Sequence, residues 1–346
     1  MKRAVKRIVY SCCATAIVVI ILLFVATFYL QWYALQASGN ERGKNIPTSY
    51  DFMLQRYPIL QNWLDSLQQT NGLRDTFIVA HNDSTLLHAL YLYADTTTSK
   101  TAVVVHGYTD NAVRMLHIGY LYNHDLHYNV LLPDLRYSGE SGGTHIQMGW
   151  NDRQDVIQWI DVAHQLFSND STTTDMVVHG ISMGGATTMC VSGEVLPYYV
   201  NCFVDDCGYT SVWDEYAGEL RQQFGLPTFP LLHLASGMTK WRYGWSFKEA
   251  SPLEQIKKCQ RPMLFIHGAN DTFVPTWMGD TLFANKKGIK EYWRVPNTGH
   301  AEAYFNYPEE YTRRVQDFVE KYNHTPVENR SSEYDQSIVT KGKVQR

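Results

Sequence analysis

A serine, an aspartate and a histidine stand in local sequences that suit nucleophilic chemistry. Ser182 lies in VVHGISMGGA, after an apolar run and before a segment of small residues. Glycines on both sides permit a sharp strand-to-helix turn that exposes the hydroxyl, and the following helix directs its first amides at the reacting centre. The alternative is that Ser182 is only a turn residue in an inactive protein, but that reading predicts loss of its partners.

Serine is a weak nucleophile until a base takes its proton, and that base needs an acid to orient it. Asp271 follows an apolar run in LFIHGANDTFVP, and His300 follows the last such run in VPNTGHAEAY. We therefore predict that Ser182 is the nucleophile, His300 the base and Asp271 the orienting acid. Asp205 and Asp206, at the end of another predicted strand, are the alternative positions for the acid.

Backbone amides near Ser182 are candidates to stabilise an oxyanion. The stretch VVVHGYTDN has a glycine after an apolar run, where the missing side chain lets a substrate approach. We predict that the amides of Tyr108 and Met183 donate to the oxyanion. Four residues are predicted to line the substrate cavity: His106, Gly107, Trp213 and Trp241. The alternative for the two tryptophans is that they form the core of their own segment.

These residues need elements that bring them together. From Asp75 onward, short apolar runs alternate with amphipathic segments, which predicts a mostly parallel, doubly wound sheet with helices on both faces. The first two runs, joined by HNDST, are predicted to form an antiparallel edge. Loops at the carboxyl ends of such strands bring residues that are distant in sequence to one site.

An insert of roughly fifty residues separates the runs VNCFVDD and RPMLFIHG, which is more than one crossover helix requires. It is rich in aromatic and aliphatic side chains, and we predict that it forms a lid at about 209–258. The alternative is an ordinary pair of helices that pack on the sheet.

From about Asp75 to Tyr322 the chain resembles the α/β-hydrolase superfamily. The resemblance rests on HGYTDN, DLRYSGESGG, GISMGG, HGANDTFVP and NTGHAEAY, which follow one another in the family's order. The chain is most similar to membrane-anchored bacterial hydrolases grouped with serine aminopeptidases and esterases. Tyr137 departs from the pattern, because many relatives have glycine there. The resemblance implies an α/β-hydrolase fold with an eight-stranded sheet, a helical lid and serine hydrolase activity.

The N-terminal region predicts a membrane anchor. Near the N-terminus lie four basic residues, Lys2, Arg3, Lys6 and Arg7, and an uncharged stretch follows at 8–40. The most apolar part of that stretch can cross about 30 Å of hydrocarbon as a helix, and Trp32 and Tyr33 suit the interface. The positive-inside rule predicts a single-pass protein with its catalytic domain on the non-cytoplasmic side. A signal peptide cleaved after Ala37 is the alternative; Leu35 and the length of the apolar region count against it.

The chain of 346 residues is 45% hydrophobic and 18% charged, which suits a globular protein with a substantial core. A net charge of -4 without a long basic block excludes a nucleic-acid footprint. Scattered cysteines indicate neither a zinc site nor a disulfide scaffold, and we expect no metal and no cofactor. The predicted organisation is a cytoplasmic tip and anchor (1–37), a linker with a helical segment (38–74), the α/β-hydrolase domain (75–322) and a disordered tail (323–346).

Three functions remain open on the sequence. Hydrolysis of carboxylic esters is the first, because an apolar lid suits acyl chains or aromatic acids. A peptidase that removes N-terminal residues is the second, and Glu215 or Glu219 in the insert would bind the free amine. The third is a surface protein that binds without catalysis on a hydrolase fold. The expected partners are a small ester or short peptide and the membrane.

Overall fold

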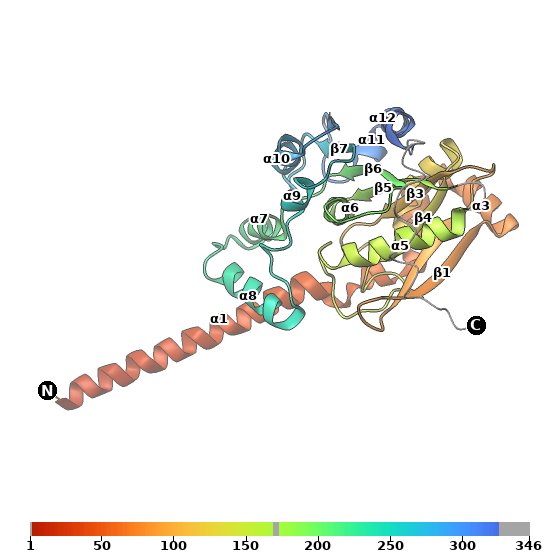
Figure 1. Ribbon diagram of the computed structural model, residues 1–346. Coiled ribbons are helices and arrows are strands. Elements are labelled where there is room, and N and C mark those ends of the chain that lie inside the picture. Colours follow the sequence, from red (N-terminus) through yellow and green to blue (C-terminus); the bar gives the residue numbers. More distant parts are fainter. Residues whose placement is uncertain (1, 169–172, 325–346) are drawn as a thin grey trace.

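The computed structural model describes residues 2–168 and 173–324. Its centre is an eight-stranded sheet with the order β1-β2-β4-β3-β5-β6-β7-β8 (Figure 1). The strands are β1 (Leu73–Val79), β2 (Leu86–Leu92), β3 (Lys100–Val105), β4 (Asn129–Pro133), β5 (Asp175–Ile181), β6 (Val200–Asp206), β7 (Met263–Gly268) and β8 (Lys290–Val295). Strand β2 pairs antiparallel with β1 and β4, and the other neighbours are parallel. The predicted antiparallel edge and parallel sheet are confirmed.

Helices cover both faces of the sheet, and alternate residues of each strand face opposite layers. Val103 and Val105 of β3 belong to the core under α5 (Asp152–Phe167), α6 (Met183–Ser192) and α10 (Trp277–Asn285). Ala102 and Val104 belong to the opposite core, under α2 (Ile46–Arg56), α3 (Leu60–Thr70), α4 (Leu116–Tyr120), α11 (Ala303–Asn306) and α12 (Pro308–Tyr322). Short turns η1 (Ala112–Met115) and η2 (Leu121–Asp125) flank α4. The predicted doubly wound architecture is therefore present.

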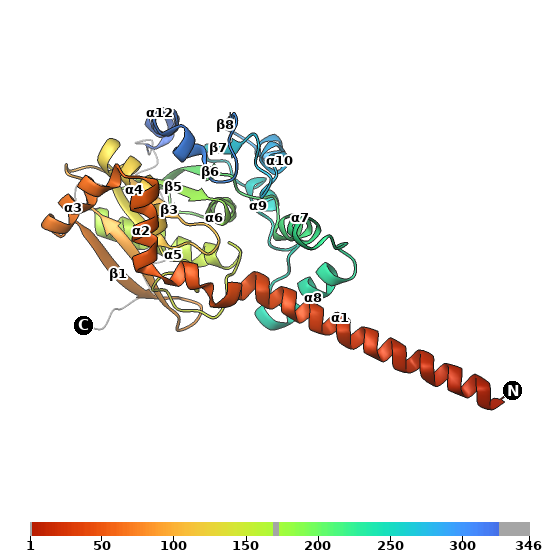
Figure 2. The same ribbon diagram turned by 180° about the vertical axis from the view of Figure 1, so that it is seen from behind.

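The insert between β6 and β7 contains α7 (Val212–Phe224), α8 (Leu231–Tyr243) and α9 (Pro252–Ile256). Helix α8 packs against α1 (Lys2–Lys44), and Figures 1 and 2 show it beside α1, away from the sheet. This arrangement favours a lid over the alternative of two helices packed on the sheet.

Helix α1 is longer than the predicted anchor. It continues through the stretch predicted as a linker to Lys44, with Asn40 in the left-handed region at φ 53°. The buried Asn40 amide donates to Tyr137 O at 2.6 Å and to Ser138 Oγ at 3.2 Å. Hydrogen bonds to the domain thus order residues 38–44, which lack the apolar periodicity that would have predicted a helix.

Two other boundaries differ from the predictions. The single helical segment expected after the linker is divided into α2 and α3 around Pro58, because proline disfavours the helical conformation of the residue before it. Asn323, predicted as the start of a disordered tail, is buried and donates to Asp175 O at 2.9 Å. The rest of the predicted tail, from 325 on, lies outside the described residues.

Candidate active site

Ser182 occupies the sharp turn between β5 and α6. Its backbone is strained, with φ 58° and ψ -119°, and its amide donates to Asp206 O at 2.7 Å. A Cβ on Gly180 would lie 2.0 Å from Gly184 O, and one on Gly184 would lie 2.0 Å from Val105 O. The flanking glycines are therefore required by close packing of the turn against β3.

The structure brings the three predicted residues into one hydrogen-bonded chain. Ser182 Oγ lies 2.8 Å from His300 Nε2, and His300 Nδ1 lies 2.7 Å from Asp271 Oδ2. The other carboxylate oxygen of Asp271 accepts from the amides of Phe273 and Val274, each at 3.0 Å. These two amides fix the carboxylate so that it can orient the imidazole.

The two alternative acids have other partners. Asp206 accepts a hydrogen bond from the Tyr311 hydroxyl at 2.9 Å, and burial raises the pKa of Asp206 to about 7. Asp205 accepts from the amide of Gly208 at 3.1 Å. In this geometry Asp271 holds the imidazole, and Asp205 and Asp206 support the base of the turn.

The loop after β3 lies against the nucleophile. A Cβ on Gly107 would be 3.6 Å from Ser182 Cβ, which puts the next residue, Tyr108, beside Ser182. Met183 is the first residue of α6. Both positions suit the predicted amide donors, whose role in catalysis stays a prediction.

His106, predicted to line the cavity, has a different position. Its side chain is fully buried, with Nδ1 2.8 Å from Gly107 O and Nε2 2.9 Å from the Leu135 amide. Since an amide can only donate, Nε2 accepts, and the proton sits on Nδ1. His106 braces the loop from behind, whereas Gly107 lines a cavity beside Ser182.

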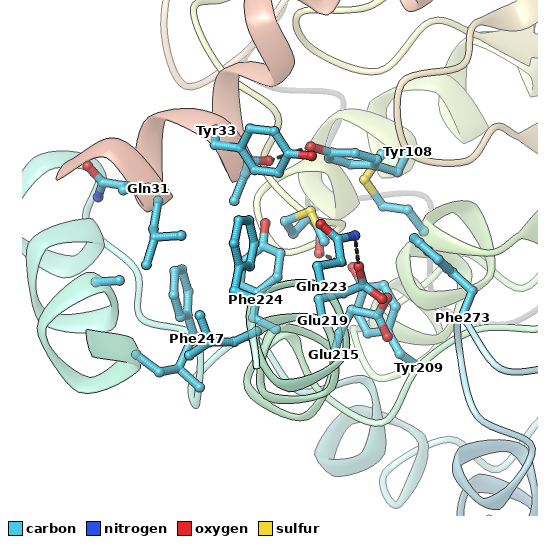
Figure 3. A pocket seen from close by; sticks show the side chains of 18 of the residues that line it. Gln31, Tyr33, Tyr108, Tyr209, Glu215, Glu219, Gln223, Phe224, Phe247 and Phe273 are labelled. Carbon is cyan, nitrogen blue, oxygen red and sulfur yellow. Dashed lines mark hydrogen bonds between the residues drawn. The ribbon is translucent and has the colours of Figure 1, made fainter. Parts of the chain in front are cut away.

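An apolar cavity of about 360 Å³ extends from Ser182 beneath the insert. Its walls include Leu220 and Phe224 from α7 and Leu30, Tyr33 and Ala34 from α1. Figure 3 shows Tyr108 and Phe273 at one side of this cavity and Gln31 and Phe247 at the opposite side. The insert therefore covers the site as a lid, and α1 contributes a wall that the sequence analysis did not predict.

Trp213 and Trp241 lie outside the set of described residues that line this cavity. Trp213 packs edge-on against His233, with ring centroids 4.8 Å apart, and beneath the Lys248 ammonium at 4.4 Å. Trp241 is 83% exposed on α8. The structure therefore does not place either tryptophan in the cavity wall: Trp213 packs against other residues of the insert, and Trp241 points outward.

Two carboxyl groups of α7 reach into the otherwise apolar cavity (Figure 3). Glu215 is 5% exposed, and its Oε2 finds no hydrogen-bond partner among the described residues. Burial, with a smaller contribution from Glu219, raises the pKa of Glu215 well above its ordinary value. Glu219, half-buried, accepts a hydrogen bond from Gln223.

A second cavity of about 360 Å³ meets the first at Ser182. Its charged lining residues are Arg42, Arg56, Arg114, Asp110 and Glu302, and His300 also lines it. Asp110 lies 2.8 Å from Arg42 and 3.6 Å from Arg114, so these two arginines are paired. Arg42 and Arg56 come from the N-terminal helices, and sequence reasoning did not connect those helices with the site. The site therefore has one apolar branch and one polar branch with charges of both signs.

Within the described part of the chain, one cluster of side chains has atoms of metal-binding type. Single ligand atoms of Cys207, Asp271 and His300 lie within 4.8 Å of one another. Burial raises the pKa of the Cys207 thiol well above its ordinary value, which disfavours the thiolate that a metal requires. Asp271 and His300 are also engaged with each other, so this cluster fits the triad chemistry better than a metal.

Residues 119–325 match the prolyl oligopeptidase family of peptidases, over more than half of the chain. The chain belongs to the prolyl oligopeptidase family. The chain is 31% identical over 234 residues to YqkD of Bacillus subtilis (strain 168). This alignment covers 67% of the chain and 75% of YqkD.

Two solved structures share the fold of this family member. The esterase Pf2001 of Pyrococcus furiosus is 20% identical, with a TM-score of 0.59 over 75% of this chain and 96% of the esterase. An acylaminoacyl peptidase of Pyrococcus horikoshii is 16% identical, with a TM-score of 0.52 over 74% of this chain and 42% of the peptidase. The expected α/β-hydrolase superfamily is confirmed, and the protein is a serine hydrolase.

Proposed function

We propose that the protein hydrolyses carboxylic esters that have an apolar acyl group, with Ser182, His300 and Asp271 as its catalytic triad. The observation that carries this proposal is the hydrogen-bonded chain of these residues beside an apolar cavity of about 360 Å³. Cavities of this size and character suit an acyl chain or an aromatic acid. The reaction needs no cofactor.

The two cavities suggest how the ester lies. His300 lines the polar branch, and a general acid must reach the departing oxygen, so the alcohol part belongs there. The acyl part then occupies the apolar branch beneath the lid.

In the proposed mechanism Ser182 attacks the ester carbonyl while His300 accepts its proton. The amides of Tyr108 and Met183 donate to the resulting oxyanion. His300 then returns the proton to the departing alcohol, which leaves an acyl group on Ser182. A water molecule, deprotonated by His300, attacks this acyl group and frees the acid and the serine.

The test is labelling and turnover by the full-length protein in detergent, with wild type beside Ser182→Ala. We expect a fluorophosphonate to label Ser182 in wild type only. We expect kcat/KM for p-nitrophenyl butyrate to fall by about 10⁴-fold in Ser182→Ala, because the nucleophile is lost. Ser192→Ala, at the far end of α6, is the matched control and should keep both properties. Equal labelling of Ser182→Ala and wild type would exclude the proposed nucleophile.

Glu215 favours a second function, removal of N-terminal residues from short peptides. Its unpartnered Oε2 beside the cavity suits an ammonium group, which would also lower the pKa of the carboxyl group. Aminoacyl p-nitroanilides compared with p-nitrophenyl butyrate at matched concentration separate the two functions. Faster turnover of the anilides would make the peptidase the better description.

We also propose that α1 is an uncleaved membrane anchor, with the catalytic domain on the non-cytoplasmic side. The helix is long and apolar enough from Val5 on to cross a membrane. Its last part also lines the apolar cavity, so cleavage after Ala37 would remove a wall of the site.

A further inference from the structure

Helix α1 has two parts with different surroundings. From Val5 to Leu22 every side chain is exposed, over about 27 Å at 1.5 Å per residue. From Leu23 on, residues at helical spacing become buried, including Thr27, Gln31 and Leu35. The uncharged residues of the first part, 8–22, extend over about 22 Å, so this part supplies most of the length that crosses the hydrocarbon of a bilayer, and the second is part of the folded domain.

The lid is fastened to α1 where its exposed part ends. Gln31 Nε2 donates to Thr239 Oγ1 of α8 at 2.8 Å, and Arg242 donates to Gln31 Oε1 at 2.8 Å. The Arg242 guanidinium also lies 5.2 Å from the centre of the Phe28 ring. These contacts hold α8 six to nine residues beyond Leu22, beside the part of α1 that would lie at the membrane interface.

The lid exposes apolar side chains at this level. Phe229, in the loop between α7 and α8, is 71% exposed, and Leu234 and Trp241 of α8 are 44% and 83% exposed. Figure 1 shows that loop and α8 on the side of the domain from which the N-terminal part of α1 projects. Trp241 stands between Lys240 and Arg242, a combination typical of a membrane interface.

An aromatic pair closes the apolar cavity where α1 meets the lid. Tyr33 of α1 and Phe224 of α7 both line the cavity, and both are more than 40% exposed. Their rings meet edge to face with centroids 6.1 Å apart. An aromatic pair that is both cavity wall and outer surface marks a place where a substrate can enter.

We propose that the cavity has a mouth between these two rings, that this mouth opens to the bilayer, and that the substrate is a long-chain ester resident in the same membrane. Its acyl chain passes between Tyr33 and Phe224 into the apolar cavity, while the lid face formed by Phe229, Leu234 and Trp241 rests in the interface. The argument rests on the proposed ester hydrolase function and on the proposed anchor. Continuity of the exposed lid face with the exposed part of α1 makes the bilayer the occupant of that face.

The test uses the full-length protein in phosphatidylcholine vesicles and two esters with the same leaving group. 4-Methylumbelliferyl acetate is supplied in water, and 4-methylumbelliferyl oleate is supplied either in the enzyme's own vesicles or in separate ones. We expect oleate hydrolysis to be about tenfold faster in shared vesicles, because the ester reaches the mouth by lateral diffusion. The rate of acetate hydrolysis should be the same whether the oleate is in the enzyme's own vesicles or in separate ones, because the acetate reaches the enzyme from water.

The matched variants change exposed apolar residues only. The triple variant Phe229→Ser, Leu234→Ser, Trp241→Ser should lower oleate hydrolysis about tenfold and keep acetate hydrolysis within about twofold, since none of the three lines the cavity. Val195→Ser, 87% exposed between α6 and β6, is the control and should change neither rate.

The outcomes separate this inference from the proposed function. Hydrolysis of neither ester by wild type removes the ester hydrolase and the inference with it. Acetate hydrolysis together with equal oleate rates from shared and separate vesicles overturns bilayer entry and keeps the esterase. A wild-type dimer that the triple variant turns into a monomer also overturns it, because the lid face would then be an interface between two copies.

Discussion

Glu215 is a residue whose chemistry depends on its surroundings. An ionised carboxylate without partners is costly in an apolar cavity, so burial favours the protonated form. A neutral carboxyl group can stay beside an acyl chain, and a cationic substrate would instead hold it ionised. The same side chain therefore tolerates an ester and favours a free amine.

The stability of Glu215→Gln should depend on pH in a defined direction. The folded-state pKa of Glu215 lies above the unfolded value, so the stability that its protonated form provides is complete below about pH 4.5 and is lost as pH rises toward the folded value. The amide of glutamine does not titrate. We expect Glu215→Gln to have the higher Tm at pH 8 and to lose this advantage toward pH 4, by differential scanning fluorimetry. Glu320→Gln, an exposed change on α12, is the control for the substitution itself. A Tm difference between Glu215→Gln and wild type that stays constant from pH 4 to 8 would show that folding does not shift the pKa of Glu215.

Single residues also show which parts of the site could be predicted from the sequence. Ser182, Asp271 and His300 could be predicted to converge because each follows an apolar run that ends at one edge of the sheet. The role of His106 could not be predicted. A histidine before a glycine has the same local sequence whether its ring faces the cavity or packs behind the loop. Tyr137, where the resemblance implies a glycine, has φ 63°, a backbone conformation that glycine adopts without strain.

At the scale of elements, α8 sets the depth of the apolar cavity. Ala235 of α8 lines the cavity and is 4% exposed. Its neighbour Ser236 accepts from the Phe247 amide at 3.1 Å, and Figure 3 shows Phe247 opposite the end occupied by Tyr108 and Phe273. Ala235 is therefore at the end that the tail of an acyl chain would reach.

Ala235→Phe should shorten the range of accepted acyl chains. The added ring fills the far end of the cavity and leaves the space near Ser182 open. We expect kcat/KM for p-nitrophenyl octanoate to fall about tenfold or more, while that for p-nitrophenyl acetate stays within about threefold. Ala235→Val should give an intermediate octanoate rate. A parallel loss for both esters would mean that the change acts on folding or on the triad.

Elements differ in how far their sequence reveals their surroundings. The alternation of apolar runs with amphipathic segments predicted the sheet and its order of helices, because strands buried on both faces need helices on each side. The cavity wall formed by α1 was not predictable in the same way. Nearly every residue at 8–35 is apolar or aromatic, so no periodicity separates a face against lipid from a face against protein.

For the whole molecule, the main question is whether α1 remains attached. Its C-terminal part is integrated into the domain: Leu35 is fully buried, its carbonyl accepts from the Ile146 amide at 2.7 Å, and the Ala34 carbonyl accepts from the Tyr108 hydroxyl at 2.8 Å. Tyr108 is also a proposed oxyanion donor. The last part of α1 therefore supports the loop that carries this proposed donor.

We expect the mature protein to keep its residues before Ser38. Intact mass spectrometry of the membrane fraction from cells that express a C-terminally tagged full-length chain should find the anchor in place. Leu35→Ala supplies the comparison, because it creates the small-x-small pattern that signal peptidases cleave at Ala37. It also removes a fully buried side chain, at a cost of about 2–5 kcal/mol. A wild-type protein that begins at Ser38 and still hydrolyses esters would mean that the domain completes its cavity without α1, and both the anchor and entry from the bilayer would have to be abandoned.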